Sequence, residues 1–399
     1  MSGIFVIGGG AAGLAAAISA ARQGAAVTVL ESGRRSAGKI LATGGGRCNF
    51  TNMNMSPDSF YDCPEVFSSA FLSAFPPVAA LDFFYSMGVI PVIRDGYAYP
   101  RSEEAASIRN ALLRECERLR VTVRNNTPAE SIKASGGFDI VSGGYTYHAD
   151  KVILAAGGKA SPVFGSNGSG YALARSLGHD ITQLSPGLSG LVCGEALKPA
   201  AGVRVYAALK LFDGEKQLMG TKGEIQINED SISGIPAMCL GRIAGRSGRP
   251  LTLEIDFAPA LTREELSEAA SCGSLDGVFP SKLASLLAAD PDPAGAAKSM
   301  RVEIKGTTGF ENAHVTSGGV ALSGIDPYTM ESKLVKGLYF AGEIMDVDGL
   351  CGGYNLHFAW ASGVMAGFSA ATGGRYLYGG TDEAHSALFK KCMTGSRRS

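Results

Sequence analysis

Three glycines near the start of the chain have the spacing of a dinucleotide-binding turn. They are Gly8, Gly10 and Gly13. An apolar run at residues 3–7 precedes them, the Ala-rich residues 11–23 predict a helix directly after them, and residues 26–30 predict a second buried strand. In such a turn the first glycine permits the bend, the second lets a pyrophosphate approach the backbone, and the third lets the helix pack on the strand. The N–H groups of the first helical turn then face the phosphates.

An acidic residue stands where the ribose of a bound dinucleotide is expected. Glu31 follows the second predicted strand, 18 positions after Gly13, and can accept hydrogen bonds from ribose hydroxyl groups. Its charge argues against NADP at this site, because a 2′-phosphate would be repelled. The alternative is a glycine-rich turn that binds no ligand.

A second glycine-rich stretch, GKILATGGGRCNFTN at residues 38–52, favours FAD over NAD. It contains too much glycine and too many polar residues for a core element. Lys39 and Arg47 offer positive charge, and Gly44–Gly46 offer backbone N–H groups without side chains, which suits a second stretch of pyrophosphate and a ribityl chain. The alternative is a mobile surface loop.

A third glycine cluster lies near the C-terminus. Residues 337–340 predict a strand that leads into Ala341-Gly342-Glu343, and Gly352-Gly353 directly precede a long apolar helix predicted at 354–370. The bare N–H groups at the start of that helix can stabilise negative charge at N1/O2 of a reduced flavin. The alternative is an ordinary turn before a helix.

Composition limits the class of protein. The 399 residues include 36 basic and 37 acidic side chains, which argues against a strongly basic nucleic-acid binder. With 45% hydrophobic and 18% charged residues the chain can build a large core. Eight cysteines form no C-x-x-C pair, so no metal site and no dithiol is predicted. Glycines interrupt the apolar residues 4–21, so no membrane span is predicted there and a cytoplasmic protein is expected.

The order of predicted elements indicates an α/β protein with an insert. After residue 184 the pattern changes to strands at 188–192, 204–212, 224–228 and 252–257, followed by short helices at 262–270 and 281–289. We predict a Rossmann-like FAD-binding domain of the glutathione-reductase/fumarate-reductase type in residues 1–188 and 316–399. It is interrupted by a β-barrel-like insert at 189–258 and a small helical insert and return at 259–315. The final GSRRS is predicted to be loose.

Four motifs, in this order, resemble one known family. The motifs are VIGGGAAG, the 38–52 stretch, TSGGV at 316–320 and GLYFAGEIMDVDGLCGGYNLHFAWASG at 337–363. The chain resembles the BaiN/YhiN-type flavoproteins, also called the aminoacetone oxidase family of FAD-binding enzymes, over nearly its whole length. This resemblance implies noncovalent FAD. Known members include a bile-acid enone reductase and an amine oxidase.

The motifs and the resemblance together assign a set of residues to FAD. These are Gly8, Gly10, Ala11, Ala12, Gly13, Glu31, Ser32, Lys39, Gly46, Arg47, Asn49, Ala129, Gly342, Glu343, Asp346, Gly353, Asn355 and Leu356. The chain departs from the family at one place. Many members carry a Thr-His pair before an SGP sequence, whereas this chain has INEDSISGIP at 227–236. A substrate role for that pair is therefore in doubt.

The expected reaction passes hydride through flavin N5 and needs a proton donor. The candidate donors are His357, Tyr354 and His314, with Cys351 and Cys48 as further candidates, and each of them is also a plausible packing residue.

We predict NAD(P)H-driven reduction of an unsaturated, enone-like small molecule. NAD(P)H would visit transiently, since there is no second dinucleotide fingerprint. A flavin amine oxidase that uses oxygen, a flavin-dependent tRNA-modifying protein and a module without turnover are the alternatives. No nucleic acid and no membrane are expected as partners, and the oligomeric state is left open.

Overall fold

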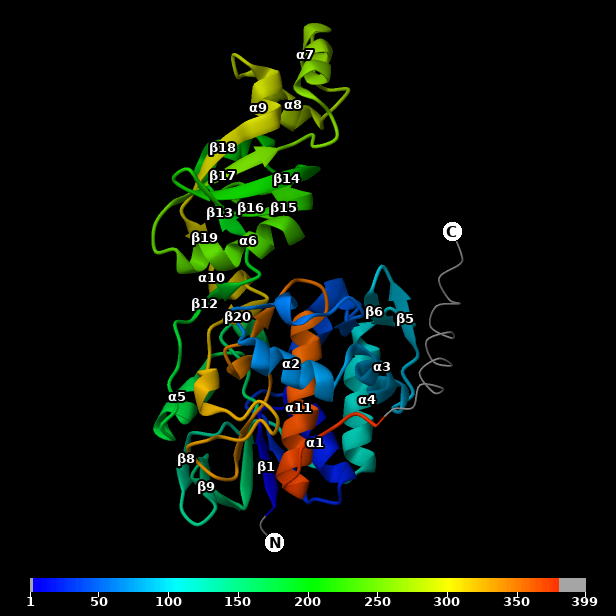
Figure 1. Ribbon diagram of the computed structural model, residues 1–399, viewed down its shortest axis with the longest axis vertical. Helices are drawn as coiled ribbons and strands as arrows, with labels where there is room; N and C mark the ends of the chain where they lie inside the picture. The colour runs from blue at the N-terminus through cyan, green and yellow to red at the C-terminus, as the bar shows by residue number, and fades with distance from the viewer. Residues whose placement is uncertain (1–2, 380–399) are drawn as a thin grey trace. The chain divides into compact units, whose positions relative to one another are not determined.

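The computed structural model describes residues 3–379 and divides into two compact units (Figure 1). Unit 1 contains the chain up to Leu184 and again from Ser317, and unit 2 contains Ser185–Thr316. Each unit has its own hydrophobic core. The insert predicted at 189–315 thus corresponds to a unit that begins and ends slightly outside those positions. The GSRRS sequence lies outside the described residues.

The core of unit 1 is a five-stranded parallel sheet in the order β21-β11-β1-β2-β7. Its strands are β1 (Ile4–Ile7), β2 (Val27–Leu30), β7 (Thr122–Arg124), β11 (Lys151–Leu154) and β21 (Leu338–Phe340). Mostly apolar and β-branched residues without Gly or Pro form β1, β2, β11 and β21, as is typical of strands covered on both faces, whereas the edge strand β7 is mostly exposed. The parallel pairing brings β21 beside β11, so the segment after β21 reaches the same sheet edge as the segment after β1.

Helices α1 (Ala11–Arg22) and α11 (Tyr354–Thr372) lie side by side (Figure 1). Small residues allow this close approach. A Cβ added at Gly363 would lie 2.4 Å from the Ala12 carbonyl oxygen, and one at Gly367 would lie 2.1 Å from that of Ala16. The backbones therefore touch along the seam, and Ser19 Oγ donates to the Val364 carbonyl at 2.8 Å.

Three further helices of unit 1 are α2 (Glu65–Ala74), α3 (Pro77–Tyr85) and α4 (Ala105–Arg118). The segment 65–85 passes a length-and-composition test for a membrane span, but its most apolar window is 56% buried in the structure. Pro76 and Pro77 divide it into two helices. It therefore has the character of core helices, and the predicted cytoplasmic location stays a prediction.

Short strands complete unit 1. An antiparallel meander contains β8 (Ser131–Ala134), β9 (Phe138–Ser142) and β10 (Tyr145–Ala149). A small sheet joins β3 (Thr51–Asn52), β6 (Tyr97–Pro100) and β5 (Pro91–Arg94), and β4 (Phe60–Tyr61) pairs with β22 (Asp348–Gly349). Helix α5 (Ser169–Ser176) follows the loop after β11.

Unit 2 is built on a seven-stranded antiparallel sheet in the order β18-β17-β14-β15-β16-β13-β19. The strands are β13 (Leu191–Val192), β14 (Arg204–Asp213), β15 (Lys216–Ile227), β16 (Ser231–Ser233), β17 (Leu251–Asp256), β18 (Met300–Ile304) and β19 (Gly306–Thr307). One residue, Lys305, separates the two outermost strands, and its N–H donates to the Val192 carbonyl at 2.9 Å. The continuous segment 300–307 thus pairs with β17 at its start and with β13 at its end, which closes the sheet into a barrel, as the sequence predicts.

Five α-helices of the described residues lie in unit 2 with this barrel, the last of them being the short α10 (Gly309–Asn312). Helices α7 (Arg263–Ser271) and α8 (Ser281–Ala288) agree with the predicted short helices, and α9 (Pro293–Ser299) follows them. Helix α6 (Ile235–Arg246) was not predicted. It contains Gly241 and Gly245, which lower helix propensity.

Candidate functional site

The first glycine turn has the geometry that its sequence requires. Gly8 has φ +104°, and a Cβ there would lie 2.3 Å from the Ala155 carbonyl oxygen at the end of β11. A Cβ at Gly13 would lie 1.9 Å from the Gly8 carbonyl, whereas a Cβ at Gly10 would meet no atom within 4 Å. Gly8 and Gly13 are therefore fixed by packing, and Gly10 faces open space at the uncapped start of α1.

The segment after β21 lies against this turn. Gly342 has φ +75°, and a Cβ there would lie 2.6 Å from Ala12 Cβ. The Gly342 N–H donates to Ser362 Oγ at 2.9 Å, which ties the segment to α11 as well. The structure thus brings together Ala12 and Gly342, which the sequence places 330 positions apart.

Glu31 is held at the end of β2 by backbone donors. Its Oε2 accepts from the Gly9 N–H and its Oε1 accepts from the Gly33 N–H, both at 2.6 Å. The Thr127 N–H donates to the Glu31 carbonyl at 2.8 Å, which places the segment leading to Ala129 beside Glu31. A carboxylate oxygen accepts more than one hydrogen bond, so Glu31 keeps capacity for ribose hydroxyls. Ser32 is exposed next to it.

An ion pair joins two of the predicted site segments. Lys39 Nζ lies 2.8 Å from Glu343 Oε2 and donates to the Ala160 carbonyl at 3.2 Å. Lys39 lies in the 3-10 segment Gly38–Gly46, and Glu343 lies in the short turn that follows β21. Within the 3-10 segment, Gly45 and Gly46 have positive φ angles and open space at their Cβ positions. The glycine stretch therefore presents backbone toward open space, as the FAD prediction requires.

Asn49 and Gly353 meet at the start of α11. Gly353 has φ +94°, and a Cβ there would lie 2.8 Å from both Asn49 Oδ1 and the Thr51 carbonyl oxygen. Asn49 is 7% exposed, and its Oδ1 is buried with no hydrogen-bond partner among the described residues. Burying an amide oxygen without a hydrogen bond costs free energy. Its position therefore indicates that a bound group donates a hydrogen bond to it.

Three further residues predicted to bind FAD lie near Gly353, and the structure gives Asn355 a role in holding the turn. Asn355 Oδ1 accepts from the Gly349 N–H at 2.8 Å and its Nδ2 donates to the Gly349 carbonyl at 3.0 Å. Asn355 therefore holds the turn before α11 rather than offering its side chain to a ligand. Leu356 and Asp346 are half-buried, and the Asp346 N–H donates to the Val320 carbonyl.

Aromatic residues surround the same turn. A Cβ at Gly352 would lie 2.6 Å from the Tyr97 ring, and Tyr354 packs next to it. The Arg47 guanidinium carbon lies 5.5 Å from the centre of the Tyr99 ring, a cation–π contact. Burial raises the pKa of Tyr99, and the Arg47 charge partly opposes this. Burial likewise raises the pKa of Tyr354.

The cysteines near the turn differ in accessibility. Cys48 is fully buried, and burial raises the pKa of its thiol to about 12. It therefore stays protonated and unreactive at neutral pH. Cys351 is half-buried at the turn itself.

The surroundings of His357 do not suit the predicted proton donor. Its side chain is fully buried, Nε2 lies 2.9 Å from the Phe75 carbonyl oxygen, and Nδ1 lies 2.9 Å from Thr51 Oγ1. A carbonyl only accepts, so the proton is on Nε2 and Thr51 donates to Nδ1. Burial lowers the pKa of His357 to about 4. Both ring nitrogens of His357 are therefore hydrogen-bonded inside the core. His357 anchors α11 to Thr51 and Phe75, and we do not propose it as the proton donor.

His314 and Tyr354 are the two other predicted donors. His314 is exposed and belongs to unit 2, where its backbone N–H donates to the Leu188 carbonyl. Tyr354 belongs to unit 1 and is 8% exposed. Within residues 3–379 no cluster of His, Cys, Asp and Glu could hold a metal ion.

The residues present fit FAD. An open glycine turn at an uncapped helix start suits a pyrophosphate, a held carboxylate suits ribose, and an unpaired Asn49 oxygen suits a polar group of the cofactor. The residues of this site were each predicted separately from the sequence. The ion pair between Lys39 and Glu343 was not predicted, because the two residues lie 304 positions apart.

Comparison with known proteins gives two kinds of match. The model of the family described as "HI0933-like protein Rossmann domain" matches residues 2–369. A 3-dehydro-bile acid delta(4,6)-reductase from Clostridium scindens is 40% identical over 93% of this chain and 99% of its own length. A ribosomal RNA dihydrouridine synthase from Escherichia coli is 30% identical over 90% of this chain and 95% of its own length.

A solved structure shares the fold at low sequence identity. The quinol fumarate reductase FrdA of E. coli matches with a TM-score of 0.53 at 18% identity, over 98% of this chain and 73% of that one. At this identity the likeness concerns the fold, and it agrees with the predicted fumarate-reductase type.

Proposed function

Because this chain belongs to the HI0933-like family, we propose that it reduces a carbon–carbon double bond conjugated to a carbonyl group in a small molecule. The observation that supports this proposal most strongly is the 40% identity, over nearly the full length of both chains, with a reductase of an oxidised, unsaturated bile acid. The predicted family, the Rossmann-type fold and the class of FAD-dependent oxidoreductase are confirmed. The electron donor NAD(P)H stays a prediction.

Unit 1 supplies the residues that would hold noncovalent FAD. The 8–13 turn and the start of α1 would bind pyrophosphate through backbone N–H groups, and Glu31 would accept from the ribose. Lys39 would balance phosphate charge while Glu343 keeps it in position. Gly353, at the uncapped start of α11, leaves the first N–H groups of that helix for the flavin.

Bound FAD supplies the hydride, so the chain itself must supply a proton. The tyrosines at the Gly352–Gly353 turn can supply it, because a phenol is protonated at neutral pH, although burial raises the pKa of Tyr99 and Tyr354 and so weakens them as acids. Tyr99 has a further advantage over the predicted donor Tyr354. The Arg47 cation over its ring stabilises the phenolate that remains after proton transfer.

The test separates the two half-reactions. NADH or NADPH is added without oxygen to the FAD-loaded protein, and the reduced protein is then mixed with a 3-oxo-Δ4 steroid. Bleaching by a nicotinamide followed by recolouring with the steroid supports the proposal. Bleaching by amines alone supports an oxidase, and no bleaching by any donor refutes turnover. Tyr99→Phe should slow recolouring by roughly 10²–10⁴-fold and leave bleaching unchanged.

A second candidate is reduction of uracil in RNA, since the relative from E. coli is named for that activity. The chemistry is shared, because the 5,6-double bond of uracil is also conjugated to a carbonyl. The charge of unit 2 favours the small molecule, because this unit contains more acidic than basic side chains. Recolouring of the reduced protein by a uridine-rich RNA and by no steroid would reverse this order.

A further inference from the structure

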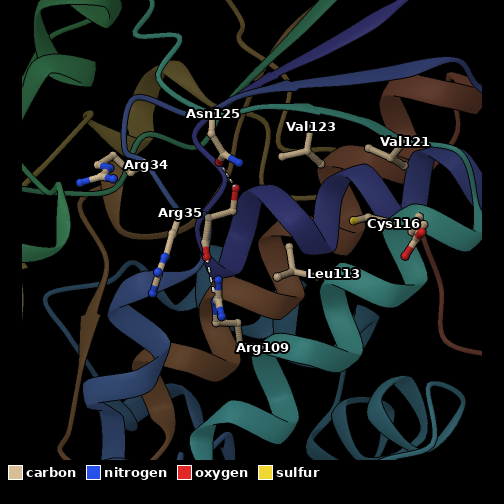
Figure 2. Close-up of a pocket in the computed structure, with 10 residues that line it drawn as sticks. Arg34, Arg35, Arg109, Leu113, Cys116, Val121, Val123 and Asn125 are labelled. Carbon is tan, nitrogen blue, oxygen red and sulfur yellow. Dashed lines mark hydrogen bonds between the residues drawn. The ribbon is translucent and has the colours of Figure 1, made fainter.

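A groove of about 320 Å³ lies in unit 1 between α4 and the segments 34–36 and 121–125 (Figure 2). Part of its wall is apolar and is made by Leu113, Cys116, Val121 and Val123. None of the residues predicted to bind FAD lines it. The groove therefore lies outside the set of residues predicted to bind FAD, next to its ribose end.

Three arginines form the polar part of the wall. They are Arg34, Arg35 and Arg109, and none of them forms an ion pair with another residue of the described range 3–379. Glu117 is the one carboxylate in the lining. Arg109 Nε donates to the Ser36 carbonyl at 3.0 Å, which fixes its guanidinium in place. Figure 2 shows the labelled arginines toward one end of the groove and Cys116 and Val121 toward the other.

We propose that this groove binds a nucleoside phosphate. Guanidinium groups without carboxylate partners bind phosphate with paired, charge-assisted hydrogen bonds, and Arg35 and Arg109 would take this part. The apolar wall covers one face of a flat base. The volume lies at the low end of the range for small-molecule sites, about 300–1,000 Å³, which fits a mononucleotide better than a dinucleotide.

Ser36 connects the groove to the ribose end of the FAD site. Its Oγ donates to Asn125 Oδ1 at 2.9 Å, and both residues line the groove. A Cβ at Gly9 would lie 2.8 Å from the same Ser36 Oγ and 3.1 Å from Glu31 Oε2. A ligand that orders Ser36 should therefore slow the release of FAD, and by linkage FAD should tighten the ligand.

The test titrates AMP and inorganic phosphate into the full-length, FAD-loaded protein by calorimetry. Arg35→Glu removes phosphate recognition, and Leu113→Trp fills the groove without changing charge. Arg114→Glu is the matched control, since Arg114 lies on the same helix, is exposed and does not line the groove. We expect saturable AMP binding that is at least about tenfold weaker in both groove variants and unchanged in the control.

Three results would overturn the proposal. They are the absence of saturable AMP binding, wild-type affinity in Leu113→Trp, and phosphate binding as tightly as AMP. Binding of an RNA oligomer that Arg35→Glu abolishes, with no AMP binding, would assign the groove to RNA instead. FAD content verifies that each variant is folded, and two independent groove variants keep the test decisive if one of them fails to fold.

Discussion

The buried His357 should make the stability of the protein fall as the pH drops below neutral. Burial lowers its pKa from 6.5 to about 4, and the bond to the Phe75 carbonyl opposes this only in part. The unfolded chain therefore takes up a proton near pH 6.5, whereas the folded protein does so only near pH 4. The contribution of the neutral His357 to the free energy of unfolding is therefore fully present above pH 6.5. It is lost progressively down to about pH 4 and amounts to about 3 kcal/mol.

Denaturant unfolding at a series of pH values measures this loss. His357→Gln is the informative variant, because its amide can still donate toward the Phe75 carbonyl and cannot take up a proton. We expect it to cost about 1–3 kcal/mol at pH 7.5 and to have a shallower loss of stability toward pH 5. His179 is also buried with a lowered pKa and titrates equally in both proteins, so the difference between the two curves isolates His357.

Two results would refute this reasoning. Parallel stability curves for wild type and His357→Gln would mean that His357 is not a buried neutral histidine. A variant with normal stability and normal FAD content that cannot transfer a proton would restore His357 to the catalytic set.

Three further predictions concern FAD retention, measured by fluorescence of released FAD. Glu31→Ala should weaken binding by roughly 1.5–3 kcal/mol for each lost ribose bond, while Glu31→Asp keeps part of it. Gly353→Ala should lower the melting temperature and FAD content together, because φ +94° and the 2.8 Å approach to the Thr51 carbonyl cost about 1–3 kcal/mol, and normal values for both would exclude this geometry. Lys39→Met should release FAD faster, because it leaves the Glu343 charge beside the phosphates, and Lys39→Met with Glu343→Gln should restore part of the retention.

Local spacing made the geometry of the first glycine turn predictable. Gly8, Gly13 and Glu31 belong to one strand-turn-helix-strand unit, so their positions follow from about thirty consecutive residues. His357 shows the opposite case. Its partners Thr51 and Phe75 lie 306 and 282 positions away, and the sequence offers no sign that these segments enclose it. A histidine one turn into a helix beside a predicted flavin thus suggested catalysis, whereas in the structure both of its ring nitrogens are hydrogen-bonded inside the core.

Helix α6 shows how tertiary packing overrides local propensity. Gly241 and Gly245 reduce the helical signal of residues 235–246. In the structure a Cβ at Gly241 would lie 2.2 Å from the Ser189 carbonyl oxygen, and one at Gly245 would lie 3.2 Å from that of Pro186. The glycines that weaken the prediction are therefore the residues that let the helix approach the 186–189 segment.

The two activities named among the relatives need the same catalytic parts, since both reduce a double bond activated by a carbonyl. In our proposal FAD bound by unit 1 and a protonated tyrosine near Gly353 would serve either substrate, so these parts do not decide between them. The discrimination must come from surfaces that a small molecule and a polyanion experience differently. Unit 2 contains more acidic than basic side chains, which disfavours contact with RNA phosphates. Three arginines of unit 1 that form no ion pair within residues 3–379, Arg34, Arg35 and Arg109, instead line a groove of mononucleotide size. The charge of this chain therefore favours a small substrate for the reaction and a small phosphate ligand for the groove.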